Sequence, residues 1–144
     1  MFVRRPLAVV LAAGAALGAG CGAEQGSNVK SASFSEPERQ AVAAAVQDFS
    51  DDVGARDYES ICADRLAAPL VKELDDARGT DECPDQVELS LRDVDENDLA
   101  VRDVKVDGTS AVATVQPTGT GNVEAQARFT LVKEGSRWKL SGLG

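Results

Sequence analysis

The spacing of apolar residues changes near residue 99, and this change constrains the fold more than any other feature of the sequence. Between residues 35 and 91, apolar side chains recur every three or four positions, which is the period of a helix with one buried face. From residue 99 onward they alternate with polar side chains, as in a strand that is buried on one side. We therefore expect an α+β fold, with N-terminal helices packed on a curved antiparallel sheet of about four strands.

The alternating half of the chain contains two predicted hairpins. In the first, the segments LAVRDVKV and SAVATVQP flank Asp107-Gly108, a pair typical of tight turns between strands. The stretch 122–142 predicts a second hairpin, which turns at Glu134-Gly135. One face of this second hairpin carries Val123, Ala125, Ala127, Phe129, Leu131, Trp138 and Leu140.

A long helix is predicted at the start of the periodic region. Ser35 suits its N-cap, and Glu38 three residues later completes a capping box. Pro37 is favourable in a first turn, and Gly54 is expected to end the helix. The apolar stripe of this helix consists of Val42, Ala45, Val46, Phe49 and Val53.

Shorter helices are expected to follow. Asp57 is predicted to cap a helix that contains Tyr58 and Cys62, and the segment APLVKEL continues as a helix after a break near Pro69.

The segment CPDQVELSLRDV allows two interpretations. Its apolar residues alternate as in a strand, but Val87, Leu91 and Val94 also fit one face of a helix. We expect a helix, because Pro84 suits a first turn and Asp85 favours the positive N-terminal end of a helix dipole.

Residues 1–20 have the composition of an export signal. Arg4 and Arg5 precede a run of 14 residues without a charged or hydrogen-bonding side chain, which is too short to span a membrane. The next motif, GAGC, ends at Cys21 and resembles the bacterial lipobox, although Gly18 occupies the position where that motif prefers leucine. We expect Cys21 to carry a lipid anchor. The alternative is ordinary cleavage before Glu24 and free secretion.

The number of cysteines supports lipidation. Three cysteines in an exported chain leave an odd thiol, and a lipid on Cys21 would account for it. Cys62 and Cys83 remain, and an even pair in an oxidising compartment favours a disulfide. Zinc is the competing interpretation, but the chain has no histidine, so a zinc site would be short of ligands. We expect no metal and no other cofactor.

The acidic stretch DVDEND was also considered as a calcium site. Asp93, Asp95 and Asn97 copy the first half of a calcium-binding loop. The second half is missing, because Asp98 stands where the loop needs glycine and Val104 stands where it needs a bidentate acid. A solvated acidic loop is the preferred interpretation.

Charge and composition divide the exported chain into a tether and one domain. Residues 21–34 follow no apolar period and are expected to form a flexible tether, and residues 35–144 form the domain. Removal of residues 1–20 takes away two of the 15 basic residues and none of the 24 acidic ones, which leaves a formal charge of −11. Such a surface repels polyanions, so we expect no nucleic-acid partner.

The order of these parts is similar to a known superfamily. The capped first helix, the segment DYESIC, the later cysteine and the terminal hairpin FTLVKEGSRWKLSGLG resemble small actinobacterial-type lipoproteins of the nuclear transport factor two-like superfamily. The resemblance covers residues 35–144 and implies a cone of curved sheet and helices around an apolar pocket. Enzymes of the superfamily, such as ketosteroid isomerases and epoxide hydrolases, place acids and tyrosines in the cone. No catalytic motif matches here.

Small side chains predict where a ligand would bind. Ala125 and Ala127 leave space beside Phe129 on the inner face of the second hairpin, and these residues with Tyr58 form the predicted ligand site. The alternative is that the first helix fills this space with Phe49 and its neighbours, because protein interiors are densely packed.

Three classes of function remain. We expect a non-catalytic binding or accessory module on the extracytoplasmic face of the cell membrane, with a small apolar ligand or an envelope protein as partner. A structural lipoprotein without a ligand is one alternative. An isomerase-like or hydrolase-like enzyme is another, but without histidine it would depend on Tyr58 or on a carboxylate such as Asp48, and both are more typical of structural positions.

Overall fold

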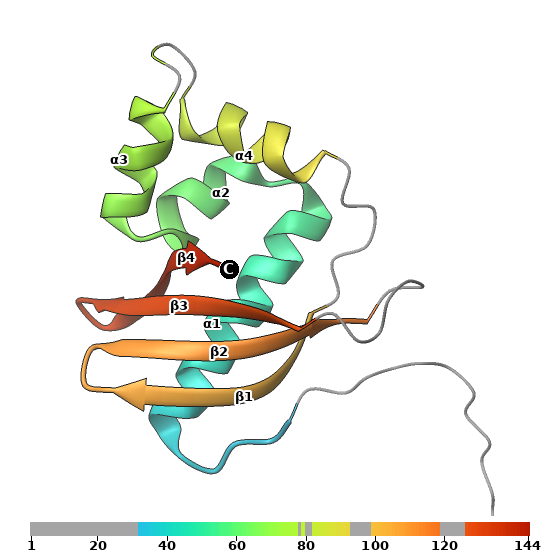
Figure 1. The fold of residues 1–144 in the computed structure, drawn as a ribbon, viewed down its shortest axis with the longest axis vertical. Helices are drawn as coiled ribbons and strands as arrows, with labels where there is room; N and C mark the ends of the chain where they lie inside the picture. The colour runs from blue at the N-terminus through green and yellow to red at the C-terminus, as the bar shows by residue number, and fades with distance from the viewer. Residues whose placement is uncertain (1–31, 78, 80–81, 93–98, 119–125) are drawn as a thin grey trace, which may run out of the picture.

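The computed structural model describes residues 32–77, 79, 82–92, 99–118 and 126–144. Within these ranges the fold is α+β, as the change of period predicts (Figure 1). The elements in chain order are α1 (Pro37–Ala55), α2 (Tyr58–Ser60), the π-helix η1 (Ile61–Arg65), α3 (Ala68–Asp76), α4 (Cys83–Leu91), β1 (Leu99–Asp107), β2 (Ser110–Pro117), β3 (Ala127–Glu134) and β4 (Arg137–Leu143).

The four strands form one open antiparallel sheet in the order β1-β2-β3-β4. Both predicted turns are confirmed, because Gly108 and Gly135 have positive φ angles of 59° and 62°, which glycine adopts without strain. The predicted strand residues Val123 and Ala125 lie outside the described residues.

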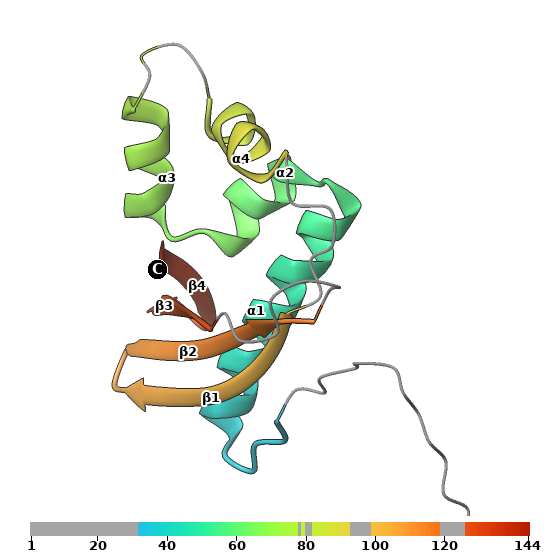
Figure 2. The same ribbon diagram turned by 45° about the vertical axis from the view of Figure 1, so that its right-hand side comes forward.

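Helix α1 crosses the inner face of the sheet, and their contact forms the core (Figures 1 and 2). The predicted apolar stripe is confirmed at four positions that are buried, and Ala45 is partly buried beside them. From the sheet, the core receives Val101, Val104, Ala111, Ala113, Val115, Phe129, Leu131, Trp138 and Leu140. The opposite face of the sheet exposes Val112, as expected for a sheet covered on one side only.

Both predicted ends of α1 differ from the structure. The N-cap is Glu36 rather than Ser35, and no side chain caps the first turn, because Glu38 instead reaches across to the sheet. At the other end, Gly54 lies inside the helix. The residue that ends it is Arg56, whose φ of 57° turns the chain and returns its amide to the last carbonyls.

The remaining helices follow the predictions more closely. The Asp57 carboxylate accepts a hydrogen bond from the Ser60 amide (3.0 Å), so the predicted cap is confirmed. The chain breaks before Pro69, which lies in the first turn of α3. The helical interpretation of the segment at Pro84 is confirmed by α4, although Val94 lies outside the described residues.

A disulfide and a backbone hydrogen bond hold the short helices in place. A disulfide joins Cys62 of η1 to Cys83 of α4, as the count of cysteines predicts. The Ala67 amide donates to the Leu140 carbonyl (2.7 Å), so the chain between η1 and α3 covers part of the free edge of β4. Within the described residues, no helix is long and apolar enough to cross a membrane.

Candidate functional site

An apolar cavity of about 150 Å³ lies where the short helices meet α1 and the end of the sheet. Its lining comes from five elements and the chain between η1 and α3. The lining residues are Phe49, Ile61, Leu66, Leu70, Leu74, Val87, Ser90, Leu91 and Leu143.

The cavity wall offers almost no polar chemistry. Among the described residues, Ser90 is the one polar residue of the lining, and the Ser90 hydroxyl donates to the Gln86 carbonyl within α4 (2.8 Å). No acid or base in the described part of the chain lines the cavity, so none of these lining residues could transfer a proton to a substrate. The site can accept a hydrocarbon surface, and it supplies no hydrogen bond that would fix a polar head group.

Partly exposed leucines form the mouth of the cavity. Leu143, near the end of β4, is 53% exposed, and Leu70 and Leu74 of α3 are only partly buried. Because α3 contributes no fully buried side chain, one wall of the cavity is an element with weak attachment to the core.

Of the predicted ligand-site residues, those that the structure describes do not line this cavity. Phe129 is buried, and its ring contacts the ring of Phe49 edge to face, with centroids 6.0 Å apart. Phe49 therefore closes over the inner face of the sheet, which was the alternative to a pocket there. Tyr58 and Ala127 are half-buried against the core without lining the cavity, and Ala125 lies outside the described residues.

Two cavity residues on α3 carry a signal that is visible in the sequence. Leu70 and Leu74 are spaced by four positions and therefore share one helical face, whereas Leu66 precedes the helix in an extended conformation. This spacing predicts an apolar stripe, but it gives no sign that the stripe borders empty space.

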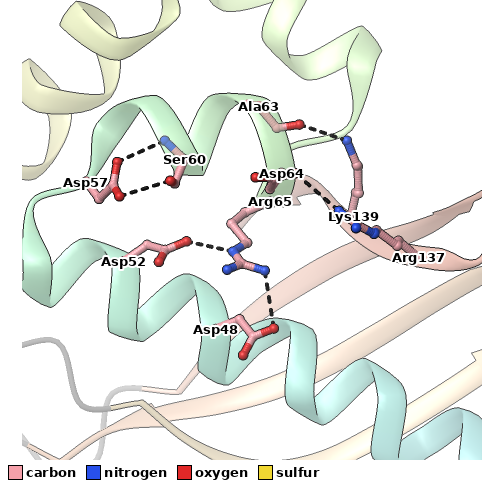
Figure 3. A network of polar contacts seen from close by, with 9 residues as sticks. All are labelled: Asp48, Asp52, Asp57, Ser60, Ala63, Asp64, Arg65, Arg137 and Lys139. Atoms are coloured by element: carbon pink, nitrogen blue, oxygen red, sulfur yellow. Dashed lines mark hydrogen bonds and ion pairs between the residues drawn. The ribbon is translucent and has the colours of Figure 1, made fainter.

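A polar network fixes the inner wall of the cavity against α1 (Figure 3). Arg65 of η1 donates through Nε to Asp52 (2.6 Å) and through an Nη to Asp48 (3.2 Å). The hydrogen bond to Asp52 raises the pKa of the Arg65 guanidinium above its usual range. Asp48, a candidate for catalysis from the sequence, is thus a partner of Arg65 in an ion pair.

The same π-helix is tied to β4 on its other side (Figure 3). Lys139 donates to the Ala63 carbonyl (3.1 Å), and Arg137 pairs with Asp64 (3.2 Å). Since η1 contributes Ile61 to the cavity and Cys62 to the disulfide, these contacts hold both features in place.

A separate open hollow of about 530 Å³ lies over the disulfide. Cys62 and Cys83 form part of its floor, and its acidic members are Glu59, Asp75 and Glu82. The Asp75 carboxylate also accepts a hydrogen bond from the Cys83 amide (2.8 Å), which links the end of α3 to the start of α4. Among the described residues, no cluster of side chains is arranged to hold a metal ion.

Taken with the fold, the cavity defines an α+β protein with a small apolar site between its helices and the edge of its sheet. No family model, curated protein or solved structure matches the chain.

Proposed function

We propose that this chain is a lipid-anchored, extracytoplasmic protein that binds a small apolar ligand without catalysis. The observation that supports binding most directly is the apolar cavity, whose described lining residues include no titratable group. A volume of about 150 Å³ is similar to that of protein cavities that stay dry and accept benzene. The resemblance to nuclear transport factor two-like lipoproteins agrees with a pocket between helices and sheet.

The anchor is the second part of the proposal, and it rests on the sequence. Cys21 follows an apolar run after two arginines and precedes a polar segment. Cells labelled with a fatty-acid analogue should mark the protein, and Cys21→Ala should release it from the membrane. Equal labelling of this variant would exclude Cys21 as the site of attachment.

Binding can be tested with benzene as the probe, since its size matches the cavity. We expect titration with benzene to shift the methyl resonances of the cavity leucines, with a dissociation constant on the order of 1 mM. The variant Leu91→Trp places an indole in the cavity wall and should abolish these shifts.

Helix α4 offers a matched control. Leu89 lies on the same helix but is 40% exposed and does not line the cavity. Leu89→Trp should therefore bind benzene as the unmodified protein does. If the unmodified protein shows no shifts, or if both variants bind equally, the structural role without a ligand becomes the better description.

A further inference from the structure

Helix α3 depends on its two ends for its position. None of its side chains is fully buried, and Leu70, Val71 and Leu74 only border the core. A helix of nine residues has little stability of its own in water. At its start, the Ala67 amide bonds to β4, and after its end the chain returns to the disulfide at Cys83.

The disulfide closes a covalent loop around this weakly held wall. Cys62 and Cys83 are 21 positions apart in sequence, and the loop between them carries Leu66, Leu70 and Leu74 of the cavity. While the bond is intact, the loop that carries α3 stays closed at Cys62 and Cys83, which limits how far α3 can move from η1 and α4. Reduction would greatly increase the number of conformations in which α3 has left the cavity. A cross-link stabilises the closed state mainly because it restricts the conformations available to the opened loop.

The disulfide is largely buried and borders one open hollow. Cys83 is 2% exposed and Cys62 is 9% exposed, and both line the hollow described above. A reductant that approaches through this hollow meets the carboxylates of Glu59, Asp75 and Glu82. Their charge repels anionic thiolates and favours a reductant with positive charge around its reactive thiol.

We propose that the Cys62–Cys83 disulfide is a reducible latch that keeps α3 closed over the apolar cavity, and that a dithiol oxidoreductase with a cationic surface opens it. The role in ligand release rests on the proposed function, whereas the movement of α3 does not. The more exposed cysteine, Cys62, is the expected point of attack.

The reaction balances as an ordinary thiol–disulfide exchange. One thiolate of the reductant bonds to Cys62, the Cys62–Cys83 bond breaks, and Cys83 leaves as a thiolate that takes up a proton. The second thiol of the reductant then attacks the mixed disulfide and releases Cys62 as a thiol. The protein disulfide gains two electrons, and the dithiol becomes a disulfide.

Hydrogen exchange tests the movement of α3 directly. The intact protein is first treated with iodoacetamide to block any free thiol, and amide exchange is then measured before and after reduction with dithiothreitol. We expect the amides of α3 and α4 to exchange at least about 10-fold faster after reduction, while β2 and β3 remain protected. Unchanged exchange in α3 would overturn the latch. Equal loss of protection in β2 and β3 would also overturn it, because the bond would then hold the whole fold.

Benzene titration of the same two samples tests the link to the cavity. We expect at least about 10-fold weaker binding in the reduced sample. Equal affinity in both samples would show that the bond does not control the site. If the oxidised protein binds no benzene, the proposed function fails, and the exchange experiment still decides whether the disulfide restrains α3.

Discussion

Glu38 makes two polar contacts between α1 and the sheet. Its carboxylate accepts hydrogen bonds from Lys133 Nζ (2.7 Å) and from Trp138 Nε1 (2.9 Å). The bond from Lys133 is the main cause that lowers the pKa of Glu38, and the bond from Trp138 adds to it. The capping-box pattern could not reveal this role, because both partners are about 100 residues away in sequence.

The lowered pKa of Glu38 predicts a pH-dependent contribution to stability. The folded state stabilises the ionised carboxylate of Glu38. Its contribution to the free energy of unfolding is therefore fully present above the ordinary pKa of 4.5, and it disappears as the pH falls through the lower pKa of the folded state. Glu38→Gln should therefore unfold at a lower temperature than the unmodified protein at about pH 7, and the difference should disappear as the pH falls through the folded pKa of Glu38.

The readout and the control for this prediction are both built into the chain. Trp138 is the single tryptophan, so its fluorescence reports on the bonded partner itself. Glu36→Gln is a suitable control, since Glu36 is well exposed and its carboxylate lies 3.8 Å from the Arg39 guanidinium. If the difference in unfolding temperature between Glu38→Gln and the unmodified protein stayed constant as the pH falls, the hydrogen bonds to Glu38 would not be the source of the pH dependence.

At the scale of elements, local sequence patterns predicted the helices and strands whose formation depends on nearby residues. The two hairpins follow from alternation and from Gly108 and Gly135, and α1 and α4 follow from apolar spacing. The π-helix η1 could not be predicted in the same way. Its contacts run to α1 through Arg65 and to β4 through Lys139, and neither partner is visible in the local sequence.

The pairing of β3 with β4 contains a position that requires glycine. The register shifts near Thr130, and a Cβ atom on Gly142 would lie 2.7 Å from the Thr130 hydroxyl oxygen. We expect Gly142→Ala to lower the free energy of unfolding by about 1–2 kcal/mol because the two side chains overlap. Chemical denaturation measures this change.

Two further variants separate this clash from a general effect of glycine replacement. Adding Thr130→Ala to Gly142→Ala should recover at least half of the loss, since it removes the hydroxyl. Gly54→Ala should stabilise the protein by about 0.5–1 kcal/mol, because Gly54 lies within α1 with no atom near its missing Cβ. Failure of the double variant to recover would argue against overlap as the cause.

At the scale of the whole molecule, the sequence predicted the layers but not the cavity that the structure shows. Alternation in the second hairpin suggested space beside Phe129, where the Phe49 ring contacts the Phe129 ring. The cavity described above forms where three short helices meet the edge of β4, and its existence depends on how closely they approach. No periodic pattern contains that information, because packing between distant elements decides it.

The charge of the whole molecule predicts how the disulfide reacts with small thiols. The formal net charge of the sequence is −9, and three of its carboxylates lie around the hollow over the bond. When each rate is divided by the rate of the same thiolate with an uncharged model disulfide, which removes the difference in thiol basicity, we expect cysteamine to reduce the bond faster than 2-mercaptoethanol, and thioglycolate to be slowest. Raising the salt from about 0.01 M to about 1 M should bring the three rates together, because the Debye length falls from about 30 Å to about 3 Å.

The double replacement Glu59→Gln and Glu82→Gln separates local charge from the overall charge. It should remove most of the difference between the thiols at low salt, whereas replacement of exposed acids elsewhere should not. If the rates of reduction changed neither with the salt concentration nor with these two substitutions, steric access alone would limit the reaction.

The hydrogen bond from the Ala32 amide to the Val101 carbonyl (2.8 Å) bears on the route by which a ligand would reach the cavity. It fixes the entry of the chain beside β1 (Figures 1 and 2), whereas Leu143 of the cavity wall belongs to β4, the strand at the opposite margin of the sheet. With the proposed anchor on the N-terminal side, the chain would enter the domain at one margin of the sheet and the ligand at the other. The domain would then have to turn on its tether before an apolar molecule could pass from the bilayer directly into the cavity.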